Sequence, residues 1–155
     1  MMTLLKPIWI VDDDQSIRFV LEKALLREGL PTRSFTHPKE VLQALERTPA
    51  DQMPMVLVSD IRMPGGSGID LLSQVKARLP GLPVIVMTAF GTVENAVEAM
   101  KAGAADFLLK PFLCLCRCTR MRIQIHVQQL LTHGRRLQCR HDLFVESIDY
   151  RSRRA

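Results

Sequence analysis

Short apolar runs alternate with helical patterns from residue 7 to residue 109, and this alternation restricts the fold more than any other feature. Runs rich in valine, isoleucine or methionine occupy 7–11, 55–59 and 83–87. Since polar residues do not alternate with apolar ones there, each run is typical of a strand buried on both faces. Two further strands are predicted at 31–35 and 106–109.

Amphipathic helices are predicted between these strands, over 16–28, 38–48, 69–79 and 92–102. Gly29 and Gly103 supply stop signals, as does the Pro80-Gly81 pair. The apolar residues expected to face the sheet are Ile17, Val20, Leu21, Ala24 and Leu25, then Val41, Leu42 and Leu45, then Leu72, Val75 and Leu79, then Val93, Ala96, Val97 and Met100.

Five strands separated by helices predict βαβ units with right-handed connections. The expected fold class is therefore α/β, a doubly wound five-stranded parallel sheet with flanking helices, as in flavodoxin-like folds. The most economical strand order is 2-1-3-4-5, whose switch point lies between the first and third strands. Ligands bind at the carboxyl edge of such a sheet beside the switch point.

Polar residues gather at that edge of the predicted sheet. The third strand ends at Asp60, and the proline and glycines over 64–68 predict an irregular loop after it. Asp14 is expected to cap the first helix. The residues expected to meet at the strand ends are Asp12 and Asp13 after the first strand, Asp60 after the third, Thr88 after the fourth and Lys110 after the fifth.

Grouped carboxylates repel one another. Proteins usually offset this repulsion by binding a divalent cation, and Mg²⁺ suits such a site because it takes oxygen ligands. A carboxylate can also act as a nucleophile toward phosphorus. We therefore expect Asp60 to be a phosphoacceptor. The expected Mg²⁺ ligands are Asp13, Asp60 and the carbonyl of Arg62, with Asp12 acting through water. Lys110 would pair with the phosphoryl oxygens, and the Thr88 hydroxyl would donate to one of them.

Each of these residues alone has a plainer interpretation. An Asp after a strand is commonly a turn residue or a cap, a Thr at a strand end is commonly structural, and a Lys is commonly solvated. The joint placement is what favours phosphoryl chemistry.

From about Lys6 to Phe112 the chain closely resembles the receiver domain of two-component response regulators. The stretches 8–18 and 59–68 look most like the nitrogen-regulation (NtrC) class of enhancer-binding regulators. The motifs that carry the resemblance, in order, are Asp12-Asp13, Asp60, Met63-Pro64, Gly68, Thr88-Ala89 and Lys110-Pro111.

The resemblance implies a switch that receives its phosphoryl group from a sensor histidine kinase and turns over no external substrate. It also implies that Thr88 moves toward the phosphoryl group while Phe107 on the fifth strand turns inward. The surface that changes comprises the fourth helix, the fifth strand and the fifth helix, and it is the family's usual face for homodimers or partners. Phe107 alone would be a core aromatic.

Two other functions remain open from the residues. An aspartyl-nucleophile phosphohydrolase also uses a strand-end Asp with Mg²⁺, Thr and Lys, but its second carboxylate would stand at position 62, where this chain has Arg62. An adaptor would use the same fold only to bind a partner, without phosphorylation.

Composition divides the chain into a predicted receiver core at 1–112 and a basic Cys/Arg-rich segment at 113–155. Residues 1–112 hold 12 Lys or Arg against 13 Asp or Glu, whereas 113–155 hold 9 against 3 and all four cysteines. The C-x-C-x-C spacing does not match the usual zinc patterns. We expect a fifth helix over 116–131 followed by a tail, and hypothesise that the chain beyond Leu113 is a non-native continuation.

The resemblance also raises expectations about what the chain lacks. No phosphate loop of the ATPase domain and no DNA-binding domain of the NtrC class is found in the sequence, so DNA contact is expected only through domains absent from it. The apolar runs are far shorter than a membrane span, and no signal peptide is recognisable, so a cytoplasmic protein is expected.

Overall fold

The computed structural model describes residues 6–89 and 93–109, and their helices and strands follow the predicted alternation closely. Boundaries differ from those expected by a few residues at most. In chain order the elements are β1 (Ile8–Val11), α1 (Gln15–Arg27), β2 (Thr32–Phe35), α2 (Pro38–Arg47), a 3₁₀ turn (Ala50–Gln52), β3 (Val56–Asp60), β4 (Arg62–Met63), β5 (Gly66–Ser67), α3 (Gly68–Arg78), β6 (Val84–Thr88), α4 (Val93–Lys101) and β7 (Asp106–Leu109).

The main sheet has five parallel strands in the order β2-β1-β3-β6-β7. This is the predicted order 2-1-3-4-5 once the two short strands β4 and β5 are set aside. Val11 pairs with Ser59, Asp60 with Met87 and Thr88 with Leu109, so the strands end nearly level at their carboxyl edge. The residues that follow β1, β3 and β6 therefore share one edge.

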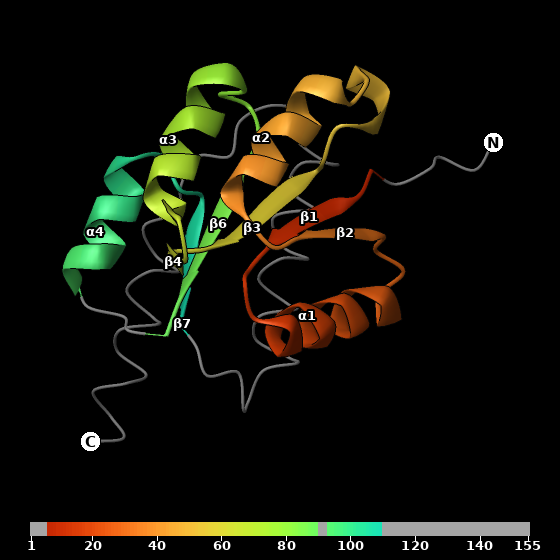
Figure 1. The fold of residues 1–155 in the computed structure, drawn as a ribbon, viewed down its shortest axis with the longest axis horizontal. Coiled ribbons are helices and arrows are strands. Elements are labelled where there is room, and N and C mark those ends of the chain that lie inside the picture. The colour runs from red at the N-terminus through yellow and green to blue at the C-terminus, as the bar shows by residue number, and fades with distance from the viewer. Residues whose placement is uncertain (1–5, 90–92, 110–155) are drawn as a thin grey trace.

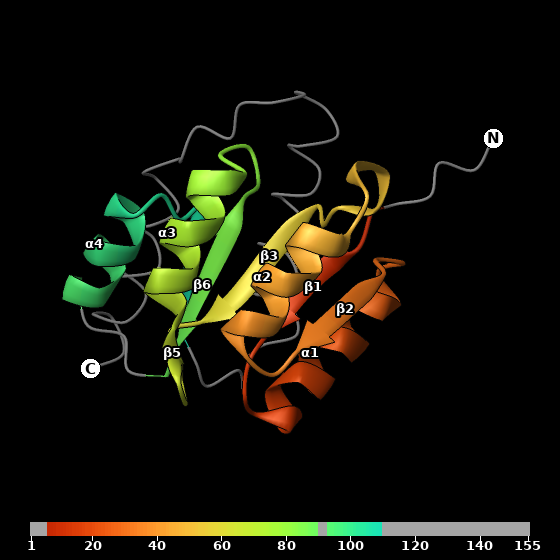
Figure 2. The same cartoon turned by 45° about the horizontal axis from the view of Figure 1, so that its top comes forward.

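Helices cover both faces of the sheet, α2, α3 and α4 on one face and α1 on the other (Figures 1 and 2). Trp9, Leu57 and Val86 belong to the core cluster that includes buried residues of α2, α3 and α4, whereas Ile10 and Val58 pack with α1. Neighbouring residues of one strand point to opposite faces, so strands covered on both faces must be apolar throughout.

Helix ends follow the expected chemistry. The Asp14 side chain accepts a hydrogen bond of 2.8 Å from the Ser16 amide, which confirms it as the cap of α1. Gly29 and Gly103 follow α1 and α4 with φ of 71° and 100°. Few residues other than glycine adopt that conformation cheaply, so both positions end their helices.

The segment after Asp60 corrects the prediction of an irregular loop. Arg62–Met63 and Gly66–Ser67 pair as a small antiparallel hairpin, and Gly68 is already the first residue of α3. A two-residue turn of Pro64 and Gly65 joins the strands, with Gly65 at a φ of 76°. Proline and glycine here permit a tight reversal instead of preventing pairing.

Two residues expected to face the sheet are instead partly exposed. Val20 in α1 is 37% exposed and Val97 in α4 is 38% exposed. The buried stripe of α4 runs through Ala96 and Ala99, and Val97 lies about 100° around the helix from Ala96. Val97 therefore stands at the margin of the buried face, where solvent reaches it.

None of the helices in the described residues is both long enough and apolar enough to cross a membrane. Lys110 and the predicted helix at 116–131 lie outside the described residues.

Candidate functional site

Three carboxylates meet at the carboxyl edge of the sheet. Asp12 and Asp13 directly follow β1, and Asp60 is the last residue of the adjacent strand β3. One oxygen from each of the three lies within 4.8 Å of the others. The parallel pairing of β1 and β3 produces this cluster, since it brings both strand ends to the same place.

The cluster fits a hard divalent cation. Its ligand atoms are all carboxylate oxygens, the type that Mg²⁺ and Ca²⁺ prefer, and three unit negative charges this close need a counter-charge. Asp12 is fully buried and Asp60 is 6% exposed, whereas Asp13 is exposed. A cation held here would be reached from the Asp13 side, where water or a phosphoryl oxygen could complete its ligands.

Asp12 is tied to the fold through both its backbone and its side chain. Its amide donates to the Phe35 carbonyl of β2 at 3.2 Å, and its carboxylate accepts from the Asp14 amide at 2.9 Å. The guanidinium of Arg18 in α1 donates to its carbonyl oxygen at 2.6 Å. The three bonds hold the turn between β1 and α1 in one conformation.

The Asp60 backbone is confined from the opposite direction by α3. The Ser59 hydroxyl donates to the Asp60 carbonyl oxygen at 3.0 Å. A Cβ added at Gly68 would lie 2.0 Å from that same oxygen. Gly68 also donates its amide to the Ile61 carbonyl at 2.8 Å. Only glycine allows the first turn of α3 to lie against the end of β3. This close packing fixes the position of the Asp60 backbone and therefore of its Cβ.

The remaining predicted site residues lie as follows. Thr88, 1% exposed, ends β6 one position after Met87, the register partner of Asp60. Phe107 in β7 is 6% exposed and belongs to the core cluster beneath α2, α3 and α4. Arg62 begins β4 with its side chain exposed, opposite Ser67. Lys110 lies outside the described residues.

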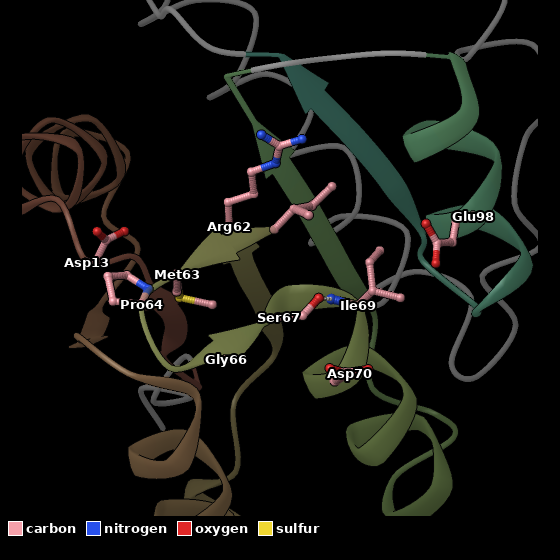
Figure 3. A pocket seen from close by; sticks show the side chains of 10 residues that line it. Asp13, Arg62, Met63, Pro64, Gly66, Ser67, Ile69, Asp70 and Glu98 are labelled. Carbon is pink, nitrogen blue, oxygen red and sulfur yellow. Dashed lines mark hydrogen bonds between the residues drawn. The ribbon is translucent and has the colours of Figure 1, made fainter.

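A pocket of about 650 Å³ opens beside the cluster, between the β4–β5 hairpin and α4. Figure 3 shows Asp13 on one side of it and Glu98 of α4 on the other, with the hairpin and the start of α3 between them. Asp13 thus lines an open space beside the carboxylate cluster.

The β2–α2 turn borders the same region and is built from polar contacts. The ring of His37 caps α2 by accepting from the Lys39 amide at 3.1 Å, and its Nε2 lies 2.9 Å from where a Cβ on Gly65 would be. The Thr36 hydroxyl donates to the Glu40 carboxylate at 2.7 Å. This hydrogen bond is the main cause that lowers the pKa of the Glu40 carboxyl below its usual value.

Sequence reasoning gave no role to Arg18, His37 or Ser59. Arg18 and Ser59 act on backbone carbonyls, a kind of contact that has no sequence motif. For Arg18 one signal existed, because side chains in the first turns of a helix point back toward its N-terminus, where the acidic residues lie. His37 precedes Pro38, and proline at the first position of a helix marks the residue before it as the cap.

Comparisons with known proteins agree with this geometry. The family model described as "Response regulator receiver domain" matches residues 8–114. The DNA-binding transcriptional regulator NtrC of Escherichia coli (strain K12) is 53% identical over 105 residues, covering 68% of this chain and 22% of that protein. The response regulator protein PilR of Pseudomonas aeruginosa is 45% identical over 102 residues, covering 66% and 22%. The chain thus spans about a fifth of the length of these curated relatives.

Solved structures show the same fold. A solution structure of the apo receiver domain of nitrogen regulatory protein C matches with a TM-score of 0.70 and 44% identity, over 81% of this chain and 97% of that one. The beryllofluoride-activated NtrC4 receiver domain dimer matches with a TM-score of 0.68 and 30% identity, over 81% and 95%.

Proposed function

Because this chain belongs to the response regulator receiver domain family, we propose that it is a phosphorylation switch of a two-component system, with Asp60 as the phosphoacceptor. The observation that carries the proposal is the position of Asp60 at the end of an interior strand, within 4.8 Å of two further carboxylates. The phosphoryl donor is a sensor histidine kinase.

In the transfer, a carboxylate oxygen of Asp60 attacks the phosphorus of the kinase's phosphohistidine. A new P–O bond forms while the P–N bond breaks, and the imidazole keeps the electron pair and takes up a proton. The product is a phosphoaspartate at Asp60, which water later hydrolyses to aspartate and inorganic phosphate. The kinase supplies the phosphoryl group, so no other co-reactant is needed.

The neighbours of Asp60 provide charge balance and positioning. Asp13, Asp60 and the Arg62 carbonyl would hold Mg²⁺, with Asp12 acting through a water molecule. When bound, Mg²⁺ offsets the negative charge of the phosphoryl oxygens. Asp12 and Asp13 keep the acidic edge preorganised. Lys110 pairs with a phosphoryl oxygen, and the Thr88 hydroxyl donates a hydrogen bond to another.

The switch then reaches the surface through β6 and β7. Thr88 turns toward the phosphoryl group while Phe107 turns inward, where packing in the core would hold it because it has no hydroxyl. The face that includes α4, β7 and the helix expected over 116–131 changes and offers a surface for a second copy of the chain. A local charge event thereby biases an element with two conformations.

The output is proposed to be transcriptional, in the cytoplasm. The relatives NtrC and PilR are named as a transcriptional regulator and a response regulator, and this chain spans about a fifth of either one. Contact with DNA would therefore be made by regions beyond the receiver. The phosphohydrolase alternative is less well supported, because Arg62 occupies the position of its second carboxylate.

The test is intact-mass analysis after incubation with Mg²⁺ and acetyl phosphate. The parent chain should gain one phosphoryl group and Asp60→Asn none. Asp51→Asn, an exposed carboxylate in the 3₁₀ turn, is the matched control and should be phosphorylated like the parent. An unmodified parent chain that is folded and still binds a partner would favour the adaptor. Continuous release of phosphate from an external ester would favour the phosphohydrolase.

A further inference from the structure

Arg18 makes a contact that the phosphoryl chemistry above does not use. It lies in the second turn of α1, and its Nη1 donates to the carbonyl oxygen of Asp12 at 2.6 Å. That distance is at the short end for an N–H···O hydrogen bond, as expected when the donor is charged. The arginine is half-buried, so solvent competes with this bond less than at an open surface.

The carbonyl that Arg18 holds belongs to the peptide between Asp12 and Asp13. A peptide unit is planar, so fixing its oxygen also fixes the plane from which both residues extend. Rotation of this unit would move the two carboxylates relative to Asp60 on the adjacent strand. We infer that Arg18 is a positioning residue for the divalent-cation site, an inference that rests on the proposed function.

Two other hydrogen bonds hold the rest of Asp12. The Asp12 amide pairs with Phe35 of β2, and the Asp12 carboxylate accepts from the Asp14 amide. Those bonds fix the incoming strand and the side chain, whereas the outgoing carbonyl is held by the guanidinium. Arg18 thus connects the rigid helix α1 to the short turn that carries two of the three carboxylates.

Arg18 also has an acidic neighbour across the edge of the sheet. Its charge is among the smaller causes, after the Thr36 hydrogen bond, that lower the pKa of the Glu40 carboxyl in α2.

A positioning role and a purely electrostatic role of Arg18 predict opposite changes in Mg²⁺ affinity when Arg18 is replaced. A positive charge near the cluster repels Mg²⁺, so removing it would strengthen Mg²⁺ binding if charge alone mattered. Loss of the hydrogen bond from Arg18 to the Asp12 carbonyl would instead weaken Mg²⁺ binding, because the two carboxylates would no longer be held toward Asp60. The sign of the change in Mg²⁺ affinity therefore separates the two roles.

The experiment is calorimetric titration of the full chain with Mg²⁺ alone. Arg18→Met removes the donor and the charge while keeping an unbranched stem, and we expect it to weaken Mg²⁺ binding by about tenfold, the scale of groups that orient metal ligands. Arg27→Met removes the same charge from an exposed position in the last turn of α1 and should bind like the parent. Arg18→Lys keeps a charged donor and should recover most of the lost affinity.

Thermal unfolding of each variant shows whether the fold survives. If Arg18→Met does not fold, Arg18→Gln takes its place with the same expectation. Equal or tighter Mg²⁺ binding by a folded Arg18→Met chain would overturn the inference and leave the proposed function intact. A parent chain that binds no Mg²⁺ would instead contradict the proposed function itself.

Discussion

At the scale of single residues, Gly68 is the described glycine with the least space for a side chain. A Cβ there would lie 2.0 Å from the Asp60 carbonyl oxygen and 2.8 Å from the Ile61 Cα, and both are backbone atoms that cannot turn away. Gly68→Ala should therefore lower the free energy of unfolding by about 1–3 kcal/mol. It should also slow phosphorylation from acetyl phosphate, because β3 and α3 must separate where Asp60 is placed.

Urea denaturation and intact-mass time courses measure the two effects of Gly68→Ala. Gly81→Ala is the control, since a Cβ at Gly81 meets nothing within 4 Å. A Gly68→Ala chain as stable and as quickly phosphorylated as the parent would show that α3 can shift away from Asp60 at little cost.

Whether the role of a single residue could be predicted from the sequence depended on the kind of contact that the residue makes. The sequence indicated that Asp12, Asp13 and Asp60 would meet, since parallel strands in the predicted order bring their carboxyl ends together. The Arg18 contact with a backbone carbonyl depends on the path of α1 over the β1–α1 turn, which a linear pattern does not encode. The roles of Thr88, Lys110, Arg62 and Phe107 stay predictions.

At the scale of elements, the stability contributed by the N-terminal end of α2 should fall at acid pH. The folded pKa of Glu40 is lowered chiefly by the Thr36 hydrogen bond, so this contact stabilises the fold fully above about pH 4.5, the usual value. The contribution is lost as the pH falls through the lowered folded pKa. Because both side chains are exposed, it is less than about 1 kcal/mol.

Thr36→Val tests this dependence, because valine keeps the β-branched shape and removes the hydroxyl. The difference in unfolding free energy between parent and variant, measured by urea denaturation, should be largest at neutral pH and shrink below pH 4.5. Thr32→Val in β2 changes the same residue type outside this contact. A difference that stays constant across the acid range would mean that Glu40 is not the partner that matters.

The helices and strands that are most deeply buried were the easiest to predict from the sequence. The strands and helices followed from apolar runs and periodic patterns, because strands covered on two faces admit few polar residues. The β4–β5 hairpin was missed, since a pair of two-residue strands leaves no periodicity to detect. Val97 was expected to be buried, but the buried face of α4 runs through Ala96 and Ala99, and Val97 lies to one side of it.

At the scale of the whole molecule, the exposed side of α4 should become an interface. Under the proposed function, this side of α4 is part of the face that changes on phosphorylation and offers a surface for a second copy of the chain. We predict that phosphorylation of this chain promotes a dimer through the face of α4 and β7. Val97, 38% exposed on α4, would supply an apolar contact in that dimer, so Val97→Glu should keep the phosphorylated chain monomeric.

Light scattering coupled to size-exclusion chromatography measures this prediction. Leu26→Glu, which alters a side chain 64% exposed on α1, is the matched control and should dimerise like the parent. Dimers formed equally by Val97→Glu, or equally with and without acetyl phosphate, would show that another surface mediates assembly.

The topology was the most predictable property of the molecule, because short βαβ connections and buried strands allow few arrangements. The strand order and the location of the acidic edge both followed from it. The segment 113–155 lies outside the described residues, so its expected helix at 116–131 and its tail stay predictions. Its proposed origin as a non-native continuation would be contradicted by finding the same segment in frame in the coding DNA of a close relative.

The central claim is that the phosphoryl group is carried by Asp60, and borohydride trapping tests it most directly. Borohydride reduces an aspartyl phosphate to homoserine, so the modified position can be read by peptide mass spectrometry. After treatment with Mg²⁺ and acetyl phosphate, homoserine should appear at position 60 and nowhere else. Homoserine at position 12 or 13, or at no position in a folded chain, would contradict the account.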